Sequence, residues 1–303
     1  MYNVDLNGVQ LAVDERGSGE AVMFVPGGLS DYRSWTAQTE LFSREYHAIT
    51  YSRRYQYPHH LVDGGVSSVS ANAEDLATLI DRLGVAPVHV VGHSYGAFTA
   101  LMCARQHPEL IRTLVLGEPP AVPLLVKDPN NPATILPLFL ANPRAAFALM
   151  KFGFKAIQPA QAAFGRGDTG AAVQAFVRGI TGRNIVVDEL PPLIREQMRA
   201  NGDALRAELD VSDAFTCEDA RGIVAPTLLV RGEQSPRFLG AIIDRLARCL
   251  PHAEQFVLRG ASHFLHWERP EAFNAALQEF LAKHGSRGPA QRSSGDRLIQ
   301  MSS

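Results

Sequence analysis

The pentapeptide GHSYG at residues 92–96 constrains the fold of this 303-residue chain more than any other feature. It lies between an apolar run at residues 87–91 and a stretch of small residues at 97–107 that is typical of a helix. A G-x-S-x-G motif in this context makes a sharp strand-to-helix turn that pushes the serine hydroxyl clear of the backbone. Its two glycines let the strand and the helix approach closely. The motif therefore predicts that Ser94 is a nucleophile, because a serine that only caps a helix would leave both glycines unexplained.

Short apolar runs alternate with helical patterns along most of the chain. Continuous apolarity is expected of parallel strands that are covered on both faces. Helices are predicted over residues 70–83 and 270–284, the second with Pro270 in its first turn and Gly285 past its end. Residues 4–13 alternate around Asn7-Gly8, which predicts an antiparallel hairpin. The pattern predicts an α/β fold with a mostly parallel, doubly wound sheet, whose strands include residues 22–25, 48–51, 88–91, 113–116, 227–230 and 255–258.

Composition narrows the class of protein. With 46% hydrophobic and 20% charged residues, the chain can bury the core of one large domain or of a domain with an insertion. A net charge of -2 provides no basic field for nucleic acid or for an anionic membrane. The N-terminus lacks the pattern of a secretory signal, and no apolar run reaches the ~20 residues of a membrane span.

The three cysteines, Cys103, Cys217 and Cys249, are odd in number and widely spaced. This spacing argues against a disulfide framework and against a zinc site, and it favours a reducing compartment. Adjacent histidines at His59 and His60 have no cysteine or carboxylate cluster nearby, so they do not predict a metal site. We expect a cytoplasmic protein without a metal.

The alternation of short apolar runs with helical patterns stops between Pro119 and Pro226. A helical pattern rich in Ala, Phe and Leu replaces it. Within this region, Arg166-Gly167-Asp168 spells a cell-adhesion tripeptide, but Asp168 is better explained as the cap of a helix over residues 171–179. Residues 285–303 are rich in Gly, Ser and Arg and show little periodicity, so we expect a disordered tail that lies outside the fold.

Together with FVPGG at residues 24–28 and GASH at 260–263, the GHSYG motif resembles the α/β-hydrolase family, and the likeness runs from about Tyr2 to His284. The resemblance implies a hydrolase core formed by residues 1–118 and 226–284. It also implies that residues 119–225 are an inserted helical cap. The activity that it implies is serine hydrolase chemistry.

A serine hydroxyl is a poor nucleophile at neutral pH and needs a base to remove its proton. His263 follows the last predicted strand and resembles the family's terminal catalytic histidine, which both accepts the serine proton and returns it to the leaving group. His266 lies three residues further on and is the alternative. Motif position favours His263.

The acid departs from the commonest family pattern. After the strand at 227–230 the family usually shows Gly-x-x-Asp, but here Gly232 is followed by Glu233 and Gln234, and Ser235 stands in place of the aspartate. A serine cannot stabilise an imidazolium. Glu118 follows the preceding strand at the same edge of the sheet, and some hydrolases take their acid from that position. We expect Glu118 to be the acid, with Glu233 as the alternative.

The oxyanion of acyl transfer needs preorganised N–H donors. Tyr95, directly after the nucleophile, supplies one, and Gly28 is the candidate for the other, because residues 25–28 take the place of the family's His-Gly loop. Pro26 replaces the family's usual histidine, whose side chain normally supports this loop. The short matches PGGL, GHSYG and EPP also resemble zearalenone-type lactone hydrolases.

These residues predict a cofactor-independent serine hydrolase that cleaves a carboxylic ester or lactone with a hydrophobic acyl or ring group. No Walker loop, dinucleotide fingerprint or HExxH motif is present, so no cofactor is implied. A homo-oligomer is left open. Two alternatives remain: C–C hydrolysis or cofactor-free oxygenation on the same scaffold, and a hydrolase-like receptor with little turnover, which Ser235 favours. Apolar side chains predicted to wall the substrate pocket from the cap are Leu124, Leu125, Phe139, Leu140, Phe147, Met150, Phe152 and Phe154; the nearby cations, a hint of an anionic substrate, are Lys127, Arg144, Lys151 and Lys155.

Overall fold

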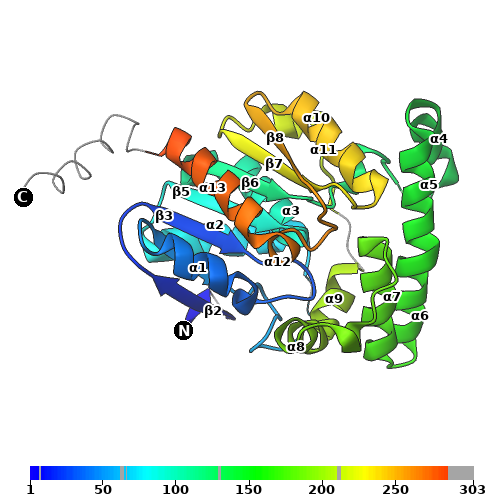
Figure 1. Ribbon diagram of the computed structural model, residues 1–303, viewed down its shortest axis with the longest axis horizontal. Coiled ribbons are helices and arrows are strands. Elements are labelled where there is room, and N and C mark those ends of the chain that lie inside the picture. Colours follow the sequence, from blue (N-terminus) through cyan, green and yellow to red (C-terminus); the bar gives the residue numbers. More distant parts are fainter. Residues whose placement is uncertain (7, 62–64, 66, 129–130, 210–212, 286–303) are drawn as a thin grey trace, which may run out of the picture.

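A computed structural model describes residues 1–6, 8–61, 65, 67–128, 131–209 and 213–285. Its centre is an eight-stranded sheet in the order β1-β2-β4-β3-β5-β6-β7-β8 (Figure 1). The first two strands pair antiparallel, β2 is antiparallel to β4, and every other neighbouring pair is parallel. The strands are β1 Tyr2–Leu6, β2 Val9–Arg16, β3 Ala21–Val25, β4 His47–Tyr51, β5 Val88–His93, β6 Ile111–Gly117, β7 Thr227–Gly232 and β8 Ala253–Leu258.

Both faces of the central strands β3 to β7 are buried, as the apolar runs predict. Successive side chains of a strand point to opposite faces, and in β3 Met23 and Val25 join one core cluster while Val22 and Phe24 join the other. The first cluster packs under α2 Val69–Leu83, α3 Tyr95–Gln106 and α11 Arg237–Cys249. The second packs under α1 Thr36–Phe42 and α13 Pro270–His284. The doubly wound prediction is therefore confirmed.

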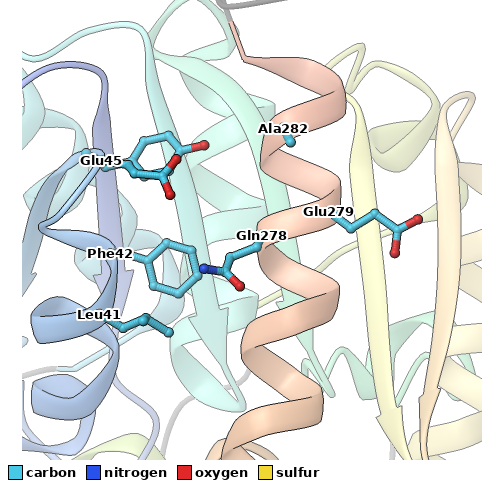
Figure 2. Close-up of a pocket in the computed structure, with 7 residues that line it drawn as sticks. Leu41, Phe42, Glu45, Gln278, Glu279 and Ala282 are labelled. Atoms are coloured by element: carbon cyan, nitrogen blue, oxygen red, sulfur yellow. The ribbon is translucent and has the colours of Figure 1, made fainter. Parts of the chain in front are cut away.

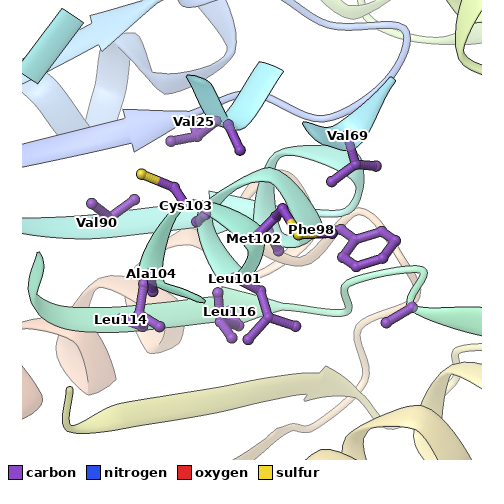
Figure 3. Close-up of a cluster of buried hydrophobic side chains, with 14 of the residues drawn as sticks. Val25, Val69, Val90, Phe98, Leu101, Met102, Cys103, Ala104, Leu114 and Leu116 are labelled. Carbon is purple, nitrogen blue, oxygen red and sulfur yellow. The ribbon is translucent and has the colours of Figure 1, made fainter. Parts of the chain in front are cut away.

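Helix α3 lies at the centre of the first cluster. Its buried side chains include Phe98, Leu101 and Cys103, which belong to one apolar cluster with residues of the sheet such as Val90 and Leu114 (Figure 3). The residues of this helix are small or flexible enough for it to be buried along most of its length. A helix fixed in this way holds its N-terminus, directly after β5, at a defined place at the edge of the sheet.

Between residues 119 and 225 the described residues form helices and turns and no strand, and most of these helices lie to one side of the sheet, in green in Figure 1. A separate apolar cluster within this region also includes Leu29 and Phe264 from the sheet's own loops. The region therefore packs on the loops that follow β3 and β8. Its helices are α4 Pro132–Ala141, α5 Pro143–Phe152, η4 Gly153–Ile157, α6 Gln158–Gly165, α7 Thr169–Thr181, α8 Pro192–Ala200, α9 Gly202–Leu209 and α10 Cys217–Arg221, with short turns η3 Val122–Leu124 and η5 Val187–Glu189.

Several local predictions are confirmed. The first two strands form the predicted antiparallel pair, and Gly8 has φ +93, while Asn7 lies outside the described residues. Asp168 caps α7 by accepting a hydrogen bond from the Ala171 N–H at 2.9 Å. Pro270 begins α13 and Gly285 follows its end. Of the predicted tail, residues 286–303 lie outside the described part of the chain.

The expectation that the cysteines form no disulfide is wrong. Cys217, in α10, and Cys249, at the end of α11, form a disulfide with a Cα–Cα distance of 5.3 Å, and Cys103 is buried and free. Wide spacing in the sequence did not keep the two residues apart, because α10 and α11 pack against each other. The cysteines therefore no longer support a reducing compartment. No helix in the described part of the chain is both long enough and apolar enough to span a membrane.

Candidate active site

The turn at residues 92–96 has the geometry that its motif predicts. Strand β5 ends at His93, α3 begins at Tyr95, and Ser94 between them has φ 51 and ψ -123, an unusual conformation for a residue with a side chain. A Cβ at Gly92 would lie 2.6 Å from the Ala97 Cα. A Cβ at Gly96 would collide with the carbonyl oxygens of Val25 and Pro26. Only glycine fits at both positions, so the sequence forces the serine to the apex of the turn.

Ser94, His263 and Glu118 form one chain of hydrogen bonds. The Nε2 atom of His263 lies 2.9 Å from Ser94 Oγ, and its Nδ1 atom lies 2.6 Å from Glu118 Oε2. The three residues follow β5, β8 and β6, and parallel strands bring their carboxyl ends to a common edge. The structure thus brings the three sequence-predicted residues together in the order that nucleophilic catalysis requires.

Glu118 is held at its position by two backbone groups of β7. It is fully buried and has φ 47, a conformation that is uncommon for a residue other than glycine. Its N–H donates to the Val230 carbonyl at 3.1 Å, and its Oε1 accepts from the Gly232 N–H at 2.8 Å. The second carboxylate oxygen is then directed at His263. Strand β7 therefore orients the Glu118 carboxylate through its backbone.

The alternatives for the acid and the base lie elsewhere. Glu233 accepts a hydrogen bond from the Gly260 N–H at 2.8 Å on the exposed surface. Ser235 lies beside Gly232, and no hydrogen bond joins it to His263 within the described residues. His266 is buried and stacks on Trp35 with ring centroids 4.0 Å apart. Burial, with His263 nearby, lowers the pKa of His266 to about 3.

His93, the second residue of the motif, has a role that the sequence did not reveal. Its Nε2–H donates to the backbone carbonyl of His263 at 2.7 Å, and its buried ring lies 4.8 Å from the His263 ring. Burial, reinforced by His263 and His266 nearby, holds the pKa of His93 well below its ordinary value. A neutral His93 therefore supports the backbone of His263. The contact joins residues that are 170 positions apart, and no local pattern signals it.

The loop at residues 25–28 lies against Ser94. A Cβ at Gly27 would be 3.2 Å from the Ser94 Cβ, and Gly28 follows it. Tyr95 is the first residue of α3, and the first N–H groups of a helix have no partner within that helix. Tyr95 thus follows Ser94 directly, and Gly28 follows the glycine that packs against Ser94.

The structure also shows which groups support the loop that contains Pro26. The carbonyl of Gly27 accepts hydrogen bonds from Arg53 Nη2 at 3.0 Å and Gln56 Nε2 at 2.9 Å, and the carbonyl of Pro26 accepts from Arg53 Nε at 2.9 Å. Arg53 is itself fully buried. Two side chains from the segment after β4 thus support the loop in which Pro26 replaces the usual histidine. Sequence reasoning missed both of them.

The family model described as "Alpha/beta hydrolase family" matches residues 22–276. The chain belongs to this family. It is 28% identical over 281 residues to a 2-(acetamidomethylene)succinate hydrolase of Mesorhizobium japonicum, with 92% of this chain and 94% of that protein covered. These findings make the chain an alpha/beta hydrolase and support a hydrolase activity.

Solved structures agree on the fold. A thermophilic esterase from Thermogutta terrifontis superposes with a TM-score of 0.71 at 23% identity, covering 94% of this chain and 100% of the other. A structure described as Est816, an N-acyl homoserine lactone degrading enzyme, gives a TM-score of 0.61 at 23% identity, with 92% and 100% covered. These relatives add no support to the narrower resemblance to zearalenone-type lactone hydrolases.

The apolar side chains of the helical region that were predicted to wall a substrate pocket differ in where they lie: some are exposed and some pack elsewhere. Leu140, Phe147 and Phe154 are 81%, 64% and 59% exposed. Phe152 instead packs on Phe238 of α11, with ring centroids 5.1 Å apart. These four residues therefore do not enclose a pocket in the structure. The apolar residues that do flank the site are next to its own loops, Leu29 after Gly28 and Phe264 after His263.

A shallow pocket lies between α1 and α13, lined by residues that include Phe42, Glu45 and Gln278 (Figure 2). No residue of the candidate site lines it. It therefore gives no information about the reaction.

Proposed function

We propose that this alpha/beta hydrolase is a serine hydrolase that cleaves a carboxylic ester or lactone without a cofactor. The observation that carries the proposal is the unbroken chain of hydrogen bonds from Ser94 Oγ through His263 to Glu118 Oε2. Each atom in it has the partner that acyl transfer requires: a nucleophile beside a base, and a base beside a buried acid.

In the proposed reaction Ser94 Oγ attacks the carbonyl carbon while its proton passes to Nε2 of His263. Glu118 stabilises the imidazolium through Nδ1, and it remains ionised throughout. The tetrahedral oxyanion accepts hydrogen bonds from the N–H groups of Gly28 and Tyr95. His263 then gives its proton to the leaving alkoxide, the carbon–oxygen bond breaks, and an acyl-enzyme remains.

Water completes the cycle by the same groups. His263 removes a proton from water, the resulting hydroxide attacks the acyl carbonyl, and the proton returns to Ser94 as the acid product leaves. We propose that residues 119–225 act as the cap over this site and that a hydrophobic acyl or ring group lies against Leu29 and Phe264. Support for this comes from the apolar cluster that these two residues share with the helical region.

A receptor with little turnover is disfavoured by the same geometry. Its support in the sequence was Ser235 at the usual position of the acid. Because Glu118 already hydrogen-bonds to His263, the substitution at 235 leaves no gap in the chain of contacts. Hydrolysis of a C–C bond on the same scaffold uses the same residue types, so the test below also includes substrates with a cleavable C–C bond.

The test combines labelling with turnover. A fluorophosphonate is expected to label the wild type and not Ser94→Ala, while the two proteins unfold at nearly the same temperature. Esters and lactones matched in acyl size should be hydrolysed, and vinylogous diketones with a cleavable C–C bond should not. An unlabelled wild type that turns over no ester or lactone would refute the proposal, and turnover of the diketones alone would replace it with C–C hydrolysis.

A further inference from the structure

One buried ion pair links the helical region to the loop that carries Gly28. Arg53 Nη2 lies 2.6 Å from Oε1 of Glu208, a residue of α9. The two side chains are only 0% and 3% exposed. They come from segments 155 residues apart. The pair thus fixes α9 to the core beneath the proposed oxyanion hole.

Both members of the pair contact the proposed oxyanion hole. The guanidinium of Arg53 donates to the carbonyls of Pro26 and Gly27 and lies 4.6 Å from the centre of the Tyr95 ring. A Cβ at Gly28 would be 2.8 Å from Oε2 of Glu208. One side of the loop is therefore hydrogen-bonded to Arg53 while Glu208 limits its movement on another side.

The pair is poorly suited to a purely stabilising role. Removing two charges from water costs several kcal/mol for each ion, and apolar side chains of similar volume often stabilise such a position equally well. Burial raises the pKa of Glu208, although Arg53 opposes this change. A charged pair with these contacts is better explained by what it positions.

We propose that Glu208 is a positioning residue, which holds Arg53 and the loop at residues 26–28 so that the Gly28 N–H points at the developing oxyanion. The inference rests on the proposed function and deepens it, because it makes the placement of α9 part of the catalytic geometry. Asn201, at the start of α9, supports the same docking: its side chain donates to Asp31 at 2.9 Å and accepts from the Tyr57 N–H at 2.8 Å. The helix is thus tied to the core at both ends.

The test is Glu208→Gln, which keeps the shape and removes the charge. A misplaced donor weakens the transition state and not the ground state, so kcat should fall by about tenfold to a hundredfold while KM changes little. The affinity for a trifluoromethyl ketone that forms a tetrahedral adduct should fall by a similar factor. Asp75→Asn is the matched control, since it breaks the neighbouring ion pair between Asp75 and Arg54, whose atoms lie 2.7 Å apart. Among the described residues, Arg54 donates no hydrogen bond to a carbonyl of residues 26–28.

Two further measurements separate positioning from stability. The double variant Arg53→Met with Glu208→Leu removes the buried charges, so it should unfold near the wild-type temperature while kcat stays low, because the carbonyls of Pro26 and Gly27 lose the hydrogen bonds that Arg53 donates. Recovery of the wild-type kcat in this variant would overturn the proposal.

The amide signal of Gly28 in the NMR spectrum should move in Glu208→Gln and not in Asp75→Asn, whether or not the protein hydrolyses esters. An unmoved Gly28 amide would refute the positioning role even if the serine hydrolase proposal held. An inactive wild type whose Gly28 amide still moved would instead leave the positioning role standing and refute the proposed reaction.

Discussion

At the scale of single residues, Glu118 is the least ordinary member of the site. It is a buried carboxylate with a positive φ, placed directly after a strand and before two prolines. Backbone strain of this kind persists only where the surroundings determine the conformation. Here the pairing of β6 with β7 continues through the Glu118 N–H, and the turned side chain reaches His263 as a result.

Glu118→Gln should lower kcat for a good ester substrate by at least about a hundredfold, since comparable changes from acid to amide cost roughly 10⁴. The amide has nearly the same size but cannot stabilise the imidazolium once His263 has taken the serine proton. Glu233→Gln is the control, because Glu233 contacts the exposed Gly260 N–H and should retain most of the activity. Steady-state kinetics of the two variants decide the matter, and a crippled Glu233→Gln with an active Glu118→Gln would contradict the assignment.

The proposed base, His263, is tested by comparing its variant with a variant of His266. His263→Ala should be as inactive as Ser94→Ala, because the nucleophile and the base act as one unit. His266→Phe should retain activity, since His266 stacks on Trp35 and no hydrogen bond joins it to Ser94 among the described residues. Rates of fluorophosphonate labelling compare the variants directly. Rapid labelling of His263→Ala together with an unreactive His266→Phe would reverse our assignment.

The residues of the site fall into those that a local pattern indicates and those that only the fold reveals. Ser94, Tyr95 and Gly28 lie in short motifs, and Glu118 and His263 follow predicted strands, so their placement could be predicted. Gln56 and Arg53 support the loop through contacts with residues at least 26 positions away. A hydrogen bond of that range depends on how two segments pack, and a linear pattern carries no record of it.

At the scale of elements, the strands were predictable because both faces of a parallel sheet require apolar residues. Strand β8 is the exception. It was expected to be covered on both faces, but Val257 is 39% exposed and Glu254 and Gln255 are exposed too. The reason is that β8 is the edge strand of the sheet. Whether a strand lies at the edge or at the centre of a sheet is set by the topology of the whole fold and not by the residues of that strand.

The helical region shows the same limit. Its helices were predictable, but which of their faces are buried was not, and Phe147 and Phe152 illustrate the point. Phe152 is half-buried and its ring packs on Phe238 and Phe176, so Phe152→Ala should lower the free energy of unfolding by about 2–3 kcal/mol, less than the about 3–5 kcal/mol of a fully buried ring. Phe147→Ala, at a side chain that is 64% exposed, should change it by less than about 0.5 kcal/mol. Urea unfolding of both variants tests this, and equal losses would place Phe147 in the core.

At the scale of the whole molecule, buried histidines link stability to pH. Burial lowers the pKa of His89 to about 4 and that of His266 to about 3, and it holds the pKa of His93 well below the ordinary value. A histidine with a lower pKa in the folded state binds its proton preferentially in the unfolded state. The stability from these residues is therefore complete above about pH 6.5 and is lost as the pH falls below it.

His266→Phe should flatten this decline. Each such histidine contributes a slope of up to about 1.4 kcal/mol per pH unit between its unfolded and folded pKa values. The phenyl ring can still stack on Trp35, but it binds no proton. Urea unfolding between pH 4.5 and 8 measures the slope, with His60→Gln, at an exposed position, as the control. A decline that is equally steep in His266→Phe would show that His266 is not a source of it.

The position of the acid has a consequence for how this protein can change in evolution. Where the acid follows β7, the loop between β7 and α11 must keep a particular side chain. Here Glu118 contacts the backbone of β7 itself, the carbonyl of Val230 and the N–H of Gly232, and backbone groups are supplied whatever the following residues are. No side chain at residues 233–235 is therefore needed to hold Glu118, whereas residue 118 directly precedes the helical region. Insertions and exchanges that diversify the helical region must leave that junction intact, so new specificities should arise more readily from the interior of the region than from its entry.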